Sequence, residues 1–341
     1  MTRKTLLLMA LLLGLWPGMP KVAQAQHAGF PARRCVNLAN ALNAPKEGEW
    51  GYVIRDADLQ RIALAGFDSV RVLIAWDQHA GAKAPYTIDP AFFARIDEVI
   101  AQAQGYGLSI ILDMHNYEGL YADPASHGPR AVALWTQIAH HYAKAPKSVI
   151  FELLNEPKDA LQGETWQRLS TQLYQVVRQR NPNRWIIMGG DNWNSIDGLA
   201  RFVAPPDPQL VLTFHYYDPY KFTHQGATWF EGAPPVGRPW GSKGGKRHLK
   251  REFTRAAALG RASGHQVWLG EFGATTATNI KDRARWTLAV RRAAEAEGMG
   301  WCSFDFATEF GVYSPKRKNW IWPLRRALFD QSALALRRSP D

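Results

Sequence analysis

Two glutamates in this sequence could act together on one substrate. Glu156 follows the apolar run 149–154, and Glu271 follows the apolar run 267–269. Hydrolysis of a glycosidic bond requires two such groups, a protonated one that donates to the leaving oxygen and an ionised one that attacks the anomeric carbon. Glu152, four residues before Glu156, is a third carboxyl group that spacing alone does not exclude as the acid.

Other side chains that follow apolar runs could support such a pair. Arg71 could keep one glutamate ionised, while a drier setting keeps the other protonated. His215 and Tyr217 could orient a carboxylate through hydrogen bonds. Tryptophans have flat apolar faces on which a sugar ring can lie. Those that we expect in loops are Trp76, Trp193, Trp229 and Trp240.

Short apolar runs alternate with amphipathic stretches about eight times along the chain. The expected strands are 35–38, 69–75, 108–113, 149–154, 185–188, 210–214, 267–269 and 300–304. The expected helices are 56–65, 90–104, 130–142, 164–180, 247–262 and 281–297. This alternation predicts an α/β fold, a single (β/α)8 TIM barrel with an elaborated loop after strand six. A doubly wound sheet fits less well, because no Gly-rich phosphate loop follows the first strand.

In such barrels, active sites lie where strands end and loops begin. Each residue at these ends could by itself have a structural role, such as packing or a buried ion pair. What favours one shared site is that Arg, His, Asn-Glu, His-x-Tyr and Glu follow different strands. The candidate site residues are Arg71, Trp76, His115, Asn155, Glu156, Trp193, His215, Tyr217, Glu271 and Phe304.

Taken in order, five segments of this chain resemble glycoside hydrolase family 5, the cellulase and mannanase family of retaining (β/α)8 enzymes. The resemblance runs from about residue 35 to residue 329, and the segment 222–229 is similar to the bacterial endoglucanase branch. The five segments are 65–71, 112–116, 151–157, 214–217 and 269–273.

The resemblance implies a role for each member of the carboxylate pair. Glu156 would be the acid/base, with Asn155 beside it to bind the sugar 2-hydroxyl. Glu271 would be the nucleophile, held by Arg71 and Tyr217. These assignments give both glutamates a function in one reaction.

The resemblance also implies which side chains surround the reacting sugar. His115 and His215 would line the subsite of the cleaved bond. Family members often carry a tryptophan at the end of strand eight, and Phe304 stands there in this chain. Its smaller ring puts the exact substrate in doubt more than the reaction.

We therefore expect a retaining endo-β-1,4-glucanase, with an endo-β-1,4-mannanase or a dual glucan/mannan hydrolase as the alternative. A non-catalytic carbohydrate-binding barrel is a remote alternative, because such a protein would tolerate loss of either glutamate. A metal-dependent barrel hydrolase would need a ligand cluster such as His-x-His after strand one, and residues 36–39 offer none. We expect no cofactor and no metal.

The expected partner is a β-1,4-linked polysaccharide, and the protein is expected to be a monomer. The net charge of +11 could favour nucleic acid. The basic residues are mostly dispersed, however, and no nucleic-acid-binding motif accompanies the cluster at 243–251. We therefore expect no nucleic-acid partner.

Residues 1–25 have the order of a secretory signal peptide. Arg3 and Lys4 precede the apolar run 5–16, and Ala23 and Ala25 offer a cleavage site. The apolar run is shorter than the roughly 20 residues that span a bilayer. We expect residues 26–341 to form the catalytic domain, secreted or periplasmic, without stable membrane insertion after cleavage.

Two cysteines, Cys35 and Cys302, fall on the predicted first and eighth strands, which are neighbours where the barrel closes. A disulfide is conceivable in an exported chain but requires suitable facing of both side chains. Buried cysteines in core strands also behave as small apolar residues. We expect two buried free thiols rather than a bridge.

Overall fold

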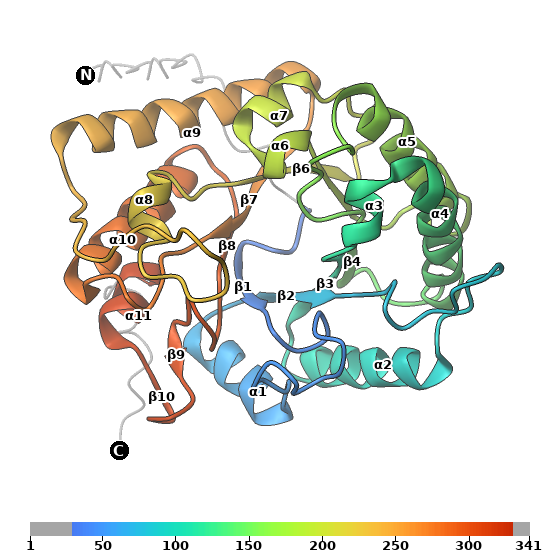
Figure 1. The fold of residues 1–341 in the computed structure, drawn as a ribbon, viewed down its shortest axis with the longest axis horizontal. Helices are drawn as coiled ribbons and strands as arrows, with labels where there is room; N and C mark the ends of the chain where they lie inside the picture. The colour runs from blue at the N-terminus through green and yellow to red at the C-terminus, as the bar shows by residue number, and fades with distance from the viewer. Residues whose placement is uncertain (1–28, 330–341) are drawn as a thin grey trace, which may run out of the picture.

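The computed structural model describes residues 29–329, and the predicted signal segment lies outside this range (Figure 1). Eight parallel strands close into a barrel in the order of the sequence, which confirms the predicted (β/α)8 fold. The strands are β1 Arg34–Leu38, β2 Ser69–Ile74, β3 Ser109–Met114, β4 Val149–Glu152, β5 Ile186–Gly189, β6 Leu210–His215, β7 Gln266–Phe272 and β8 Trp301–Ser303.

Helices surround the barrel (Figure 1). The long ones are α1 Asp56–Ala65, α2 Pro90–Gly105, α4 Pro124–His141, α5 Gly163–Arg180, α9 Lys243–Ser263 and α10 Ile280–Ala296. The short helices are α3 Glu118–Ala122, α6 Asp191–Asn194, α7 Ile196–Arg201, α8 Tyr220–Thr223 and α11 Trp322–Leu328. An antiparallel pair, β9 Tyr313–Ser314 and β10 Asn319–Trp320, precedes α11.

Two predicted helices begin earlier than expected, because each has a side-chain cap. Asp123 accepts a hydrogen bond from the Ser126 amide and starts α4 with a proline in its first turn. Ser242 accepts one from the Gly245 amide and starts α9 at Lys243, four residues before the predicted start, with two glycines in the first turn. Capping therefore outweighs the glycine content at this position.

The elaborated loop after β6 is confirmed and contains the short helix α8. The buried side chain of Gln225 joins two parts of this loop through hydrogen bonds. Its side-chain NH2 donates to the Phe222 carbonyl, and its Oε1 accepts from the amides of Gly237 and Arg238. This bonding gives a long irregular segment a defined path beside the strand ends.

Inward-facing side chains fill the barrel in two layers, because alternate residues of a strand point to the same side. The lower one, which we call the apolar layer, consists of Cys35, Ile111, Ile150, Ile187, Val211, Trp268 and Cys302. Two residues further along the strands lies the second, which we call the ionic layer: Asn37, Arg71, Asp113, Glu152 and Thr213. All of these side chains are buried.

The expectation of two free thiols is wrong, because Cys35 and Cys302 form a disulfide. The two residues are register partners on β1 and β8, with their Cα atoms 4.1 Å apart. Both belong to the apolar layer inside the barrel. The deciding facts are thus the register and the shared inward facing, neither of which is visible in the sequence.

No helix within residues 29–329 is both long enough and apolar enough to cross a bilayer.

Candidate active site

A cleft of about 1260 Å³ opens at the carboxyl ends of the barrel strands. It reaches from the loop after β1 to the loops that follow β6 and β8. Most of the predicted site residues meet in it, and Arg71 lies buried beneath them. Those that line the cleft are His115, Asn155, Glu156, Trp193, His215, Tyr217, Glu271 and Phe304.

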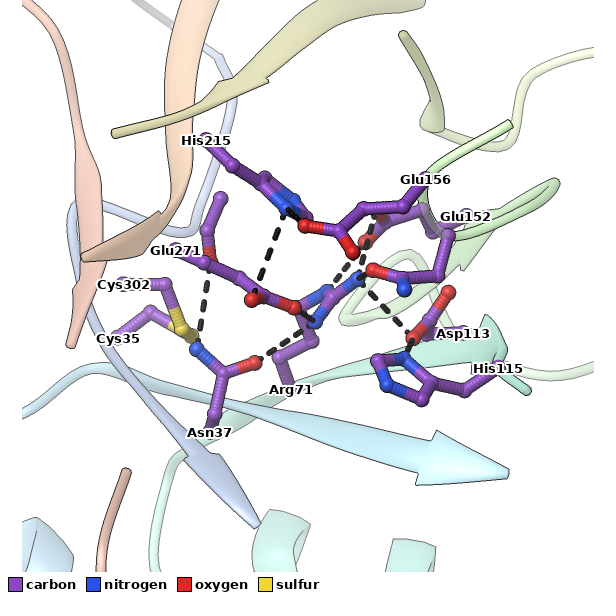
Figure 2. A network of polar contacts seen from close by, with 12 residues as sticks. Cys35, Asn37, Arg71, Asp113, His115, Glu152, Glu156, His215, Glu271 and Cys302 are labelled. Atoms are coloured by element: carbon purple, nitrogen blue, oxygen red, sulfur yellow. Dashed lines mark hydrogen bonds and ion pairs between the residues drawn. A yellow bond between two sulfur atoms is a disulfide. The ribbon is translucent and has the colours of Figure 1, made fainter. Parts of the chain in front are cut away.

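Arg71 is the centre of the polar network beneath the cleft (Figure 2). Its Nε and Nη2 donate to the two oxygens of Glu152, at 2.6 and 3.0 Å. Nη1 donates to Glu271 Oε1 at 2.7 Å, and Nη2 lies 3.0 Å from Asp113 Oδ2. Burial alone would lower the pKa of Arg71, but the three carboxylates together raise it. The guanidinium therefore stays charged and fixes all three acids.

Glu271 is held by hydrogen bonds at both oxygens. Arg71 donates to Oε1, and the Tyr217 hydroxyl donates to Oε2 at 2.8 Å. Burial and the nearby negative charge of Glu271 raise the pKa of Tyr217 well above its ordinary value, so its phenol remains a donor. Glu271 thus has the environment of an oriented carboxylate, as its predicted role requires.

Glu156 lies across the cleft and has a different environment. Its Oε1 is 2.7 Å from Nδ1 of His215, which is also 3.6 Å from Glu271 Oε2. Burial raises the pKa of Glu156, although the cations Arg71 and Lys158 oppose the shift. A raised pKa favours the protonated form that a general acid needs.

The distance between the two glutamates distinguishes the two classes of glycosidase. A carboxylate oxygen of Glu156 and one of Glu271 lie within 4.8 Å of each other. Inverting enzymes need roughly 6.5–9.5 Å to place a water between the groups, whereas retaining enzymes have about 5–5.5 Å. The observed spacing corresponds to the retaining class.

Glu152, which spacing alone left open as the acid, is unsuited to that role. Its side chain is fully buried, and both of its oxygens accept hydrogen bonds from Arg71. Glu152 does not line the cleft, so it cannot reach a leaving group there. It serves instead to hold Arg71.

His115 is oriented by an acid that the sequence did not single out. Its Nδ1 lies 2.6 Å from Asp113 Oδ2, and that oxygen also lies close to Arg71. Burial lowers the pKa of His115 to about 3, so the imidazole is neutral near pH 7. With Nδ1–H donating to Asp113, Nε2 remains as an acceptor.

Asn155, beside Glu156, is also fixed in orientation. Its Oδ1 accepts a hydrogen bond from Arg71 Nη2 at 2.9 Å. Its backbone carbonyl accepts another from the Tyr121 hydroxyl at 2.6 Å. The side-chain oxygen is thus used within the protein, which leaves the NH2 group as the donor for a ligand.

The predicted tryptophan platforms divide into exposed and buried ones. Trp193 and Trp229 line the cleft and are about half exposed, at 50% and 48%. The prediction for Trp76 is wrong, since the side chain is fully buried and packs against Phe92 and Phe93. Trp240 lies in a loop, as expected, but its side chain is buried and does not line the cleft.

Aromatic residues that the sequence did not single out complete the cleft. Trp50 is 43% exposed in the loop after β1, and its position there could not be deduced without the path of that loop. Phe304 packs edge to face with Phe310, which also contacts Trp229. The floor near β8 is therefore a cluster of rings rather than one large indole.

A run of left-handed residues presents Trp193 to the cleft. Asn192, Trp193 and Asn194 have φ values of 54°, 58° and 51°. Such conformations are uncommon outside glycine and concentrate at functional sites. The Trp193 amide donates to the carbonyl of Pro157, which connects this turn to the residue after Glu156.

Within the described residues, one group of side chains could geometrically hold a metal ion: Glu156, His215 and Glu271. Glu271 already accepts hydrogen bonds from the Arg71 guanidinium and from Tyr217. Glu156 and His215 already contact each other. The arrangement is thus accounted for by its own hydrogen bonds.

Comparison of the sequence with profiles of known protein families identifies the family. The cellulase (glycosyl hydrolase family 5) profile matches residues 30–309. The chain belongs to this family. Endoglucanase H of Acetivibrio thermocellus is 28% identical over 301 residues, which cover 86% of this chain but only 32% of that protein. Cellodextrinase A of Ruminococcus flavefaciens is 28% identical over 258 residues, which cover 72% of this chain and 76% of that protein.

Solved structures of the family agree with the fold of this member. A Thermotoga maritima Cel5A structure in complex with cellobiose has a TM-score of 0.86 and 39% identity. It covers 88% of this chain and 98% of its own. A structure of the same protein with mannotriose gives the same score, identity and coverage.

Proposed function

We propose that this family 5 glycoside hydrolase is a retaining endo-β-1,4-glucanase. The observation that carries the proposal is the pair Glu156 and Glu271, whose carboxylate oxygens lie within 4.8 Å of each other across the cleft. The open cleft with its exposed tryptophans suits a long polysaccharide that is cut internally. The endoglucanases among the relatives support the same substrate class.

In the first step, Glu271 attacks the anomeric carbon while Glu156 gives its proton to the departing oxygen. A covalent glycosyl-enzyme forms at Glu271, and the first product leaves with the transferred proton. In the second step, ionised Glu156 removes a proton from water as the water attacks the same carbon. The bond to Glu271 breaks, and both glutamates return to their starting states.

A β-1,4-mannanase or a dual glucan/mannan hydrolase is the second candidate. It is supported by the Thermotoga maritima Cel5A structure with mannotriose, which comes from a protein that is 39% identical to this chain. Phe304 adds to it, since a smaller ring near β8 leaves more room around the reacting sugar. The catalytic pair would be the same for both polymers.

We also propose that the protein is secreted or periplasmic, because the order of residues in 1–25 is that of a cleavable signal peptide. A polysaccharide substrate outside the cytoplasm fits this location. Fractionation of expressing cells, with amino-terminal sequencing of the exported form, tests both. A cytoplasmic protein that still begins at Met1 would contradict the proposal.

A substrate panel tests the main proposal. The purified protein is assayed on carboxymethyl cellulose, mixed-linkage glucan, xyloglucan, mannan and xylan, and product sizes are measured. We expect the highest kcat/KM on a β-1,4-glucan and a range of oligosaccharides early in the reaction. Activity confined to mannan would favour the second candidate, and release of single sugars from chain ends would exclude endo action.

The stereochemistry of the product tests the mechanism. Proton NMR of the first-formed product should show the β-anomer before mutarotation, because two displacements restore the original configuration. A first-formed α-anomer would sink the double-displacement scheme.

Two variants separate the roles of the glutamates. Glu271→Ala should abolish turnover on every substrate, because attack is always required. Glu156→Ala should be slow on polysaccharides but retain activity on aryl glycosides with good leaving groups, and azide should increase it further. If Glu271→Ala were the variant rescued by good leaving groups, the two roles would be reversed.

A further inference from the structure

His215 has one ring nitrogen whose partner is not explained by the reaction. Nδ1 faces the glutamates, whereas Nε2 is buried and has no hydrogen-bond partner within residues 29–329. Three other buried atoms also lack a hydrogen-bond partner within these residues: Oγ1 of Thr213 and both side-chain amide atoms of Asn194. Thr213 and Asn194 are fully buried, and His215 is 7% exposed. Buried polar groups without partners are rare in folded proteins, so this cluster requires a physical account.

Two glycines on the neighbouring strands bring these polar atoms together. A Cβ atom on Gly270 of β7 would stand 2.5 Å from Thr213 Oγ1 and 3.0 Å from His215 Nε2. A Cβ atom on Gly189 of β5 would stand 2.1 Å from Asn194 Oδ1 and 3.0 Å from Thr213 Cγ2. Any side chain at either position would therefore displace the polar groups. Gly270 thus lets Thr213 Oγ1 and His215 Nε2 lie close to its backbone, and Gly189 lets the Asn194 amide lie beside the Thr213 methyl group.

The other side of the imidazole shows where its proton must lie. Nδ1 is 2.7 Å from Glu156 Oε1 and 3.6 Å from Glu271 Oε2. The carboxylate of Glu271 attracts a proton on Nδ1 and would repel a lone pair there, and an Nδ1–H can donate to Oε1 of Glu156. The neutral ring therefore carries its proton on Nδ1, and Nε2 is an acceptor that needs a donor.

We propose that a buried water hydrogen-bonded to Thr213 Oγ1 donates a hydrogen bond to Nε2 of His215, so that Thr213 is a positioning residue for the acid Glu156. Thr213 Oγ1 and His215 Nε2 both lie within 3.0 Å of the Cβ position on Gly270, so they are close to each other, yet no direct hydrogen bond joins them. One water can join two buried polar atoms in this relation. The hydroxyl and the imidazole give the water two polar partners, which is the minimum that a buried water needs.

The arrangement has a consequence for the acid, and this part rests on the role proposed above for Glu156. With Nδ1–H donating to Oε1, the proton of the acid must be on Oε2. No residue of the described chain makes a hydrogen bond to Oε2, so that oxygen is available to a leaving group. Donation to Nε2 also polarises the ring and strengthens the Nδ1–H donor.

Other charged and titratable groups surround His215 and Glu156, and the Thr213 variants described below leave them in place. Burial lowers the pKa of His215 to about 4, so the ring remains neutral across the working range. The groups that interact electrostatically with His215 or Glu156 are Arg71, Asp113, His115, Tyr121, Glu152, Lys158, Tyr217 and Glu271.

The variant Thr213→Val removes the hydroxyl and keeps the shape, and Thr213→Ser keeps the hydroxyl. Without the donor at Nε2, the Nδ1–H bond to ionised Glu156 weakens and its pKa rises. We expect the alkaline limb of kcat/KM for Thr213→Val to move to higher pH, with kcat about two- to tenfold lower. Thr213→Ser should match the wild type in both. A limb that stays in place in Thr213→Val, or that moves equally in Thr213→Ser, would overturn the proposal.

Nitrogen-15 NMR of histidine-labelled wild-type protein tests the same idea without substrate. We expect the His215 ring to carry its proton on Nδ1 near pH 7, and a proton on Nε2 would overturn the proposal. This measurement also decides the matter if Thr213→Val does not fold. It stands apart from the proposed function, because an enzyme inactive on every β-1,4-glucan would contradict that function and leave the tautomer as measured.

Discussion

On the four strands that contribute to both layers, β1, β3, β4 and β6, the apolar layer and the ionic layer lie two residues apart, yet their chemistry is opposite. On β4, Ile150 belongs to the lower layer and Glu152 to the upper one. On β1, Cys35 is covalently bonded, while Asn37 accepts a hydrogen bond from Arg71 at 2.9 Å. Apolar burial stabilises the lower layer directly. Buried charges contribute less to stability and are kept where geometry matters.

The difference indicates that the apolar layer stabilises the barrel, whereas the ionic layer orients the residues of the active site. The ionic layer contains an arginine shared by three carboxylates, and two of its neighbours, Glu271 and Asn155, line the cleft. The apolar layer has no contact with the cleft. Changes in the two layers should therefore separate into loss of rate and loss of stability.

The largest effect should come from Arg71→Met in the ionic layer. The change leaves three buried carboxylates without their cation, which should cost about 3–5 kcal/mol of unfolding free energy. Misplacement of Glu271 should also lower kcat/KM by about a hundredfold or more. Urea unfolding and steady-state kinetics measure both. Arg71→Lys is the control: it keeps the charge but not the fork of donors, so a fully active Lys variant would show that charge alone is enough.

Removal of the disulfide should affect stability without affecting rate. The double change Cys35→Ala and Cys302→Ala should cost about 2–5 kcal/mol of unfolding free energy, while kcat stays within experimental error of the wild type. Thermal unfolding and kinetics on the same preparation test this.

Intact mass of the wild type supplies the control for that experiment. After alkylation under denaturing, non-reducing conditions, we expect no added label, because both cysteines are bonded. Two added labels would show that both cysteines are free thiols, as the sequence suggested, and would contradict the disulfide.

A milder change in the apolar layer should give a smaller effect of the same kind. Ile187→Val removes one methylene from a fully buried side chain and should cost about 0.5–1.5 kcal/mol. We expect kcat/KM and its pH dependence to remain as in the wild type. A measurable shift in either would show that the apolar layer also sets the active-site geometry.

The smallest effect on stability should come from Lys158→Met at the edge of the cleft. The ammonium group lowers the pKa of Glu156, so its removal should raise that pKa. The alkaline limb of kcat/KM reports loss of the acid's proton and should therefore move to higher pH. Denaturant midpoints should change little, because Lys158 has two weak contacts, a 3.6 Å ion pair with Glu118 and a position 4.9 Å from the centroid of the Tyr121 ring. Each such contact contributes about 1 kcal/mol or less. A limb that moves to lower pH would contradict the sign.

The sequence was sufficient for the barrel and for most residues at its rim. Apolar runs that alternate with helical stretches predicted each of the eight barrel strands but not the pair β9 and β10. Position at a strand end predicted that Glu156 and Glu271 share one cleft. Position after a strand was not sufficient for Trp76, whose ring is buried in the core, or for Trp50, which lines the cleft from the loop after β1. These outcomes depend on loop paths that only three-dimensional packing determines.

Buried partners were harder to predict than exposed ones. Asp113 and Glu152 sit inside strands and look like interruptions of an apolar pattern, although they orient His115 and Arg71. The bond between Cys35 and Cys302 depends on a register that places them directly opposite each other. Such features follow from how strands are staggered around the barrel, which the order of residues does not specify.

The disulfide joins β1 to β8 across a sequence separation of 267 residues. It therefore closes nearly the whole barrel into a covalent ring. A protease that cuts one surface loop between those two cysteines would open the ring without releasing a fragment. The two pieces would stay attached next to the strands at which the barrel closes. A single cut would then not by itself separate the parts of the barrel.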